Sequence, residues 1–113
     1  MKRSDVPLPP ATFYILFALA AGEKHGYGIM QEARRLSDER FQMGPATLYT
    51  TIQRLLDSGW IAEAAGPGDA DPRRRYYRLT TPGRSAFHRE MERMEALVRK
   101  SKALRLRPME SQS

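Results

Sequence analysis

The chain has 113 residues, which is the size of one small domain, alone or with a dimerisation element. It has no cysteine, which excludes a disulfide scaffold and a cysteine-ligated metal site. Hydrophobic residues make up 41% and charged residues 28%, which excludes a wholly disordered chain. Nineteen basic and thirteen acidic side chains give a net charge of +6, which favours a polyanionic partner, either nucleic acid or an anionic membrane surface.

A short apolar run at residues 13–21 follows the basic residues Lys2 and Arg3, an order that also occurs in secretory signals. Asp5 and three prolines interrupt the approach to this run, and its nine residues are far fewer than the ~20 that span a bilayer. We therefore expect a cytoplasmic protein with a buried helix over residues 11–21, which starts at Pro10 and ends before Gly22.

This first helix is apolar around its whole circumference, and Phe13 and Phe17 contribute to that surface. A helix of this kind must be covered on all sides. A chain of this size can cover only one side of the helix with its own core. We therefore expect a second copy of the chain to cover the other side.

A second helix is expected over residues 27–36, where Ile29, Ala33 and Leu36 recur at helical spacing. Residues 25–28 would be the turn into it. We interpret His25 as a locally bonded turn residue and not as a metal ligand, because the chain has only two histidines. Residues 37–40 are a polar connection, and residues 41–43 are expected to form a very short strand.

A third helix is expected over residues 45–58, with Pro45 in its first turn and Gly59 at its end. Its large apolar side chains gather on one face: Leu48, Ile52, Leu55 and Leu56. The opposite face is rich in hydrogen-bonding groups, namely Thr47, Thr50, Thr51, Arg54 and Ser58, and it is flanked by Ala46, Gln53 and Asp57. Such groups bond phosphates or base edges, and arginine can bond guanine in two places. The same pattern also fits an ordinary solvated helix surface.

Two strands, at residues 60–65 and 73–80, flank a glycine-rich turn and predict a hairpin. Alternation places Tyr77 and Leu79 on one face of the second strand. Three arginines stand near the tip: Arg73, Arg74 and Arg75. They suit contact with phosphates or the minor groove, although clustered arginines also serve solubility and the nearby Asp69 and Asp71 partly cancel their charge.

A last helix is expected over residues 82–104, with Thr81 as N-cap and Pro82 at the first position. One stripe of apolar side chains runs along it: Phe87, Met91, Met94 and Val98. The stripe is longer than a small domain needs, so it predicts helix pairing between two chains. Four of the six excess positive charges lie in residues 81–113, and residues 106–113 are expected to be a flexible tail.

The order of these elements predicts a mainly α fold with a β-hairpin wing. Residues 8–80 would form a winged helix-turn-helix DNA-binding domain, and residues 81–105 a C-terminal dimerisation helix. In that arrangement the third helix is the recognition helix and the hairpin is the wing.

Three segments resemble the PadR-type transcriptional regulators. They are residues 15–19 (ILFAL) with 24–29 (KHGYGI), 46–49 (ATLY) with 54–55 (RL), and 74–80 (RRYYRLT) with 83–84 (GR). The single short C-terminal helix resembles the smaller subgroup of that family. The resemblance implies a homodimeric repressor, sometimes released by a small ligand. Residues 82–104 contain no Trp, so the aromatic-sandwiching ligand mode of drug-sensing relatives is not implied here.

The leading hypothesis is therefore a sequence-specific DNA-binding regulator, a homodimeric repressor that reads an inverted repeat. The expected DNA contacts are Thr47, Tyr49, Thr50, Gln53, Arg54, Arg73, Arg74 and Arg75. The expected dimer interface is Phe13, Phe17, Phe87, Met91, Met94 and Val98. The Tyr49 ring fits a core role equally well, and the resemblance favours its phosphate contact.

Two alternatives stay open. The same fold could be a winged-helix protein-interaction module without DNA binding, and the same positive charge could serve a protein that binds RNA or a membrane surface. An enzyme is least expected, because no nucleophile–base pair, phosphate loop or metal cluster is found in the sequence. No cofactor is expected, and the operator, the regulated gene and any small-molecule effector stay open.

Overall fold

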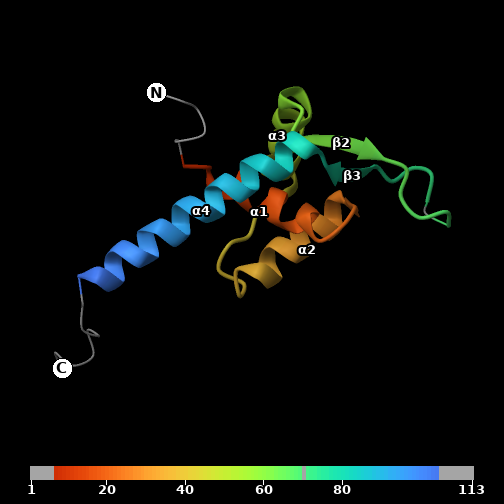
Figure 1. Ribbon diagram of the computed structural model, residues 1–113. Helices are drawn as coiled ribbons and strands as arrows, with labels where there is room; N and C mark the ends of the chain where they lie inside the picture. The colour runs from red at the N-terminus through yellow and green to blue at the C-terminus, as the bar shows by residue number, and fades with distance from the viewer. Residues whose placement is uncertain (1–6, 70, 105–113) are drawn as a thin grey trace.

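The computed structural model describes residues 7–69 and 71–104. Within them the elements follow in the order α1 (Pro10–Ala20), β1 (Lys24–His25), α2 (Gly26–Leu36), α3 (Pro45–Ser58), β2 (Ile61–Ala64), β3 (Tyr76–Leu79) and α4 (Thr81–Ala103) (Figure 1). The predicted helices are all present and their bounds differ from expectation by one residue at most. The expected tail, residues 106–113, lies outside the described residues.

The strands form one antiparallel sheet in the order β1-β3-β2. β2 and β3 pair from Ile61 opposite Leu79 to Ala64 opposite Tyr76, which confirms the predicted hairpin (Figure 1). The prediction of a strand at residues 41–43 was wrong. The third strand is instead Lys24–His25, which pairs with the free edge of β3.

Residues 41–43 turn into the core instead of joining the sheet. Met43 is buried, and the Phe41 ring stacks on Tyr14 with ring centroids 4.9 Å apart. The amide of Phe41 donates to Ser37 Oγ at 2.9 Å, so this backbone is bonded to the end of α2 and not to a strand. The apolar residues Phe41 and Met43 therefore alternate because both side chains pack into the core, and not because the segment is a strand.

Helix α1 is the centre of the core and packs against α2, α3, β3 and α4 (Figure 1). One side of it is buried in the main hydrophobic cluster: Ile15, Leu16, Ala18 and Leu19. Phe13 and Phe17 stay half-buried within one chain. The chain therefore leaves the outer side of α1 partly uncovered.

Two helices start one residue earlier than predicted because an upstream side chain caps them. His25 Nδ1 accepts from the Gly28 amide at 3.1 Å, so α2 starts at Gly26. Thr80, and not Thr81, caps α4: its Oγ1 accepts from the Gly83 amide at 3.1 Å. The Thr80 hydroxyl also donates to the Gly59 carbonyl at 2.6 Å. This second hydrogen bond fixes the side chain in the capping position.

Helix α4 docks on the body along its first half and then extends away from it (Figure 1). Gly83 approaches the backbone of Trp60 so closely that a Cβ would overlap the Trp60 carbonyl oxygen. Farther along, Leu97 and Val98 are half exposed and Leu104 is 69% exposed. The second half of α4 thus has apolar side chains without a partner in the described part of the chain.

A buried carboxylate, Glu90, fastens the segment before α1 to α4. Its oxygens accept two bonds from Arg93, at 2.9 and 2.8 Å, and one from the Leu8 amide at 3.3 Å. The hydrogen bonds from Arg93, aided by the Leu8 amide, hold the pKa of Glu90 below its usual value despite its burial.

Replacing Glu90 with Gln should lower the free energy of unfolding at neutral pH by about 1–2 kcal/mol, because the charge-assisted bonds from Arg93 are lost. A carboxyl with a lowered folded pKa stabilises the protein above its unfolded pKa of about 4.3 and stops doing so as pH falls through the folded value. The acid sensitivity of the wild type should therefore diminish in the variant. Denaturant titrations at neutral and acid pH measure this, with exposed Glu92→Gln as control. Equal pH dependence in both variants would contradict it.

Candidate nucleic-acid interface

Helix α3 presents a polar face to solvent. Four of the expected DNA contacts are exposed on α3: Thr47, Thr50, Gln53 and Arg54. Gln53 Nε2 donates to Asp57 Oδ1 at 3.0 Å. Thr51, expected on the same face, is only 7% exposed. Helix α3 packs against α1, α2 and β2. These neighbours cover more of its surface than the predicted apolar face, so Thr51 is buried as well.

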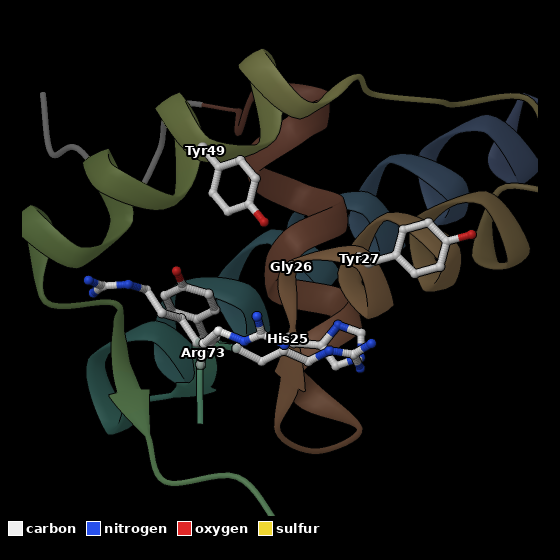
Figure 2. A pocket seen from close by; sticks show the side chains of 8 residues that line it. His25, Gly26, Tyr27, Tyr49 and Arg73 are labelled. Atoms are coloured by element: carbon white, nitrogen blue, oxygen red, sulfur yellow. The ribbon is translucent and has the colours of Figure 1, made fainter. Parts of the chain in front are cut away.

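Tyr49 projects from α3 toward the start of α2, and the residue is 51% exposed. Figure 2 shows its hydroxyl directed at Gly26. A Cβ at position 26 would overlap Tyr49 Oη and lie 3.0 Å from Tyr49 Cζ. The position of this hydroxyl therefore depends on a glycine at the first residue of α2.

The three consecutive arginines, residues 73–75, lie in the connection before β3 and not in the strand, where they were expected. Arg73 Nη2 pairs with Asp71 at 3.2 Å, and Arg75 Nη1 pairs with Glu63 at 3.0 Å. The backbone amide and then the guanidinium of Arg73 hold the pKa of the Asp71 carboxyl below its usual value. Two of the three positive charges are thus partly offset by neighbouring carboxylates.

Arg74 has a different environment. Its Nη1 lies 3.1 Å from His25 Nε2, and within the described ranges no carboxylate lies at ion-pair distance from it. Burial, and then the Arg74 charge, lower the pKa of His25, so its imidazole is neutral at neutral pH. Among the described residues, Arg74 is the one of the three arginines that forms no ion pair with a carboxylate, although its charge also acts on Asp71 from a longer distance.

These side chains line one open cleft of about 360 Å³ where the start of α2, helix α3 and the segment before β3 meet (Figure 2). The structure places four expected contacts there: Tyr49, Arg73, Arg74 and Arg75. The other four, on the face of α3, do not line it. His25 and Tyr27 also line the cleft, and sequence reasoning missed both. Their signal was their place at a helix start, where backbone amides favour anions.

The expected dimer residues fall into two groups. The first is a cluster of three half-buried rings between α1 and α4: Phe13, Phe17 and Phe87. Their centroids are 5.1 to 5.7 Å apart. The second group lies farther along α4: Met91, Met94 and Val98. These three line a shallow groove with Glu95 and Arg99, so they are accessible to another molecule.

Within residues 7–69 and 71–104, no group of three or more His, Asp or Glu side chains is placed to hold a metal ion. No helix in that part of the chain is both long enough and apolar enough to cross a membrane. His88 lies exposed on α4, 3.6 Å from Glu92.

The sequence matches known transcriptional regulators. The family described as "Transcriptional regulator PadR-like family" matches residues 15–89. The transcriptional regulator Rv3488 of Mycobacterium tuberculosis is 35% identical over 86 residues, which cover 76% of this chain and 77% of that protein. Uncharacterized protein X of Lysinibacillus sphaericus is 33% identical over 85 residues, covering 75% and 78%.

Solved structures of regulators share the fold. A transcriptional regulator from Clostridium thermocellum superposes with a TM-score of 0.68 at 30% identity, covering 86% of this chain and 90% of that one. A PadR family regulator from Clostridium difficile gives 0.70 at 18% identity, covering 85% and 98%. Bacillus subtilis PadR in complex with operator DNA gives 0.58 at 23% identity, covering 68% and 44%.

These likenesses and the observed elements confirm the predicted winged-helix fold with its β-hairpin wing. The family match extends over more than half of the chain, from α1 into α4. Two relatives are more than 30% identical to this chain, and the matched segment covers more than three quarters of the length of each. This chain therefore belongs to the PadR-like family of transcriptional regulators.

Proposed function

We propose that this regulator binds double-stranded DNA as a homodimeric repressor. Residues 8–80 make the DNA-binding domain, in which α3 reads base edges in the major groove and the arginines before β3 hold the phosphate backbone. The observation that carries the proposal is the cleft at which Tyr49 of α3 and the arginines of residues 73–75 meet. Membership in a family of transcriptional regulators separates the chain from enzymes.

Charge and chemistry support this assignment. The exposed hydroxyl, amide and guanidinium groups of α3 are those that bond bases and phosphates. The net charge of +6 adds a sequence-independent attraction to DNA. Bacillus subtilis PadR, a protein of similar fold, was solved with operator DNA. The expected cytoplasmic location remains part of this proposal.

The homodimer rests on the uncovered apolar surfaces of α1 and α4. Residues 81–105 would pair with the same helix of a second copy through the groove lined by Met91, Met94 and Val98. Two recognition helices related by a twofold axis would then read an inverted repeat, with half-sites about one or two turns of DNA apart.

Titration of a labelled duplex with the protein at several salt concentrations tests DNA binding. We expect log affinity to fall linearly with log salt, because each neutralised phosphate releases counterions. Genomic fragments selected by the purified protein would supply the operator. Absence of salt-dependent duplex binding would overturn the proposal and favour a protein-interaction module.

The three arginines should differ when each is replaced with Ala. Arg74→Ala should lower the salt slope by about one, on operator and scrambled DNA alike. Arg73→Ala and Arg75→Ala should lower it less, because carboxylates already offset those charges. Asp71→Asn should strengthen binding, since it frees Arg73. Equal effects of all three arginine variants would contradict this.

Arg54→Ala should act differently, because Arg54 is held on a rigid helix. If it bonds a base in two places, its loss should reduce discrimination between operator and scrambled DNA by roughly 1–3 kcal/mol. Competition titrations with operators substituted at single positions measure this, and Arg74→Ala is the control that should leave discrimination unchanged. A uniform loss of affinity would instead make Arg54 a phosphate contact.

Gly26→Ala should weaken DNA binding without unfolding the protein. The new methyl displaces the Tyr49 hydroxyl, which is the movable end of a half-exposed side chain, so the overlap can be relieved without disturbing the backbone. Thermal unfolding and the duplex titration measure the two effects. Tyr49→Phe should reproduce the loss if the hydroxyl contacts DNA, and unchanged affinity in both variants would exclude that contact.

Met91→Glu combined with Met94→Glu should shift the protein toward monomer, because charge would be buried at the interface without a partner. Thr81→Glu with Ser85→Glu adds the same charge on another, exposed face of α4 and should leave the dimer intact. Sedimentation of the variants and of the wild type decides this. A folded wild-type monomer at micromolar concentration would contradict it.

A further inference from the structure

The contact between His25 and Arg74 contains a conflict of hydrogen-bond donors. A neutral imidazole has one nitrogen that accepts and one that donates. Two donors face this ring: the Gly28 amide lies 3.1 Å from Nδ1, and Arg74 Nη1 lies 3.1 Å from Nε2. A guanidinium has no acceptor atom, so only one of these contacts can be a hydrogen bond.

The acceptor is Nδ1. The Gly28 amide is fixed in the first turn of α2, and its bond to Nδ1 is the side-chain cap of that helix. Arg74, in contrast, is exposed and can donate to water. The proton of the neutral ring is therefore on Nε2, and an N–H group faces the Arg74 guanidinium.

The surroundings keep this arrangement in place without supplying an acceptor. The Tyr76 ring meets the His25 imidazole edge-on, with centroids 5.3 Å apart. β1 pairs His25 with Tyr76 in the sheet, which holds the histidine at the base of the wing. In the described residues the carboxylates near this segment pair with Arg73 and Arg75, so none is bonded to Arg74. Two donors thus converge at one edge of an open cleft.

We propose that His25 Nε2–H and Arg74 bind one and the same phosphate of the DNA backbone. This inference rests on the proposed DNA binding and adds a contact from the start of α2, between the recognition helix and the wing. The non-bridging oxygens of a phosphate accept several hydrogen bonds, so one phosphate removes the conflict between the two donors. Tyr49 of α3 lines the same cleft as this pair.

Sharing one phosphate has a measurable consequence. If the two side chains bind separate phosphates, their contributions to the binding free energy add independently. If they bind a single phosphate, the contribution of each depends on the presence of the other. Arg74 supplies the charge, so its loss lowers the salt slope. His25 supplies a neutral donor, so its loss weakens binding at every salt concentration without changing the slope.

A double-mutant cycle with His25→Asn and Arg74→Ala tests this on a labelled random-sequence duplex. Asparagine keeps an N-cap oxygen for the Gly28 amide but does not reach the place of Nε2, so α2 should stay folded, as thermal unfolding will verify. We expect His25→Asn to weaken binding about three- to tenfold in the wild type. In the Arg74→Ala background the further loss should be below about twofold.

Equal losses from His25→Asn in both backgrounds, or no loss in the wild type, would overturn the shared phosphate. A wild-type protein that does not bind the duplex would instead overturn the proposed function. Nitrogen-15 NMR of the free protein gives an independent readout: the His25 proton should be on Nε2, and its signal should shift on adding duplex but not on adding inorganic phosphate at the same concentration. A proton on Nδ1, or an equal shift with inorganic phosphate, would contradict the inference.

Discussion

The burial of α1 is the constraint on which the other elements depend. Ile15 and Leu16 are fully buried, and each such side chain contributes about 1.5–3 kcal/mol through removal of apolar surface from water. Helices α2, α3 and α4 and strand β3 all pack against α1, so its position determines where their ends lie. In particular, it brings α3 so close to the start of α2 that Tyr49 lies against Gly26.

A second, smaller interaction organises the candidate interface. The pairing of the two-residue strand β1 with β3 joins the start of α2 to the base of the wing. His25 and Arg74, 49 positions apart in the chain, become neighbours through this pairing. The cleft therefore belongs to three elements at once, and its charge depends on which arginines have carboxylate partners as much as on how many arginines the wing carries.

The two halves of helix α4 differ in their surroundings. Its first half is fastened to the body by Gly83, which lies against the Trp60 backbone, and by Glu90, which bonds the segment before α1. Its second half carries apolar side chains that the described part of the chain leaves uncovered. In the proposed homodimer, a helix that is anchored at one end and apolar beyond it would hold the second copy in a defined orientation, which reading an inverted repeat requires.

The sequence by itself determined the helices, the hairpin and the fold class, because these follow from local signals: the spacing of apolar residues, Pro10 and Pro45 at helix starts, and Gly59 in the left-handed conformation at the end of α3. It also predicted four of the eight residues that line the cleft: Tyr49, Arg73, Arg74 and Arg75. Strand β1, the burial of Thr51 and the separate partners of the wing arginines were decided by the tertiary structure alone. Each depends on which distant segments meet, and that is set by packing around α1, which no local pattern contains.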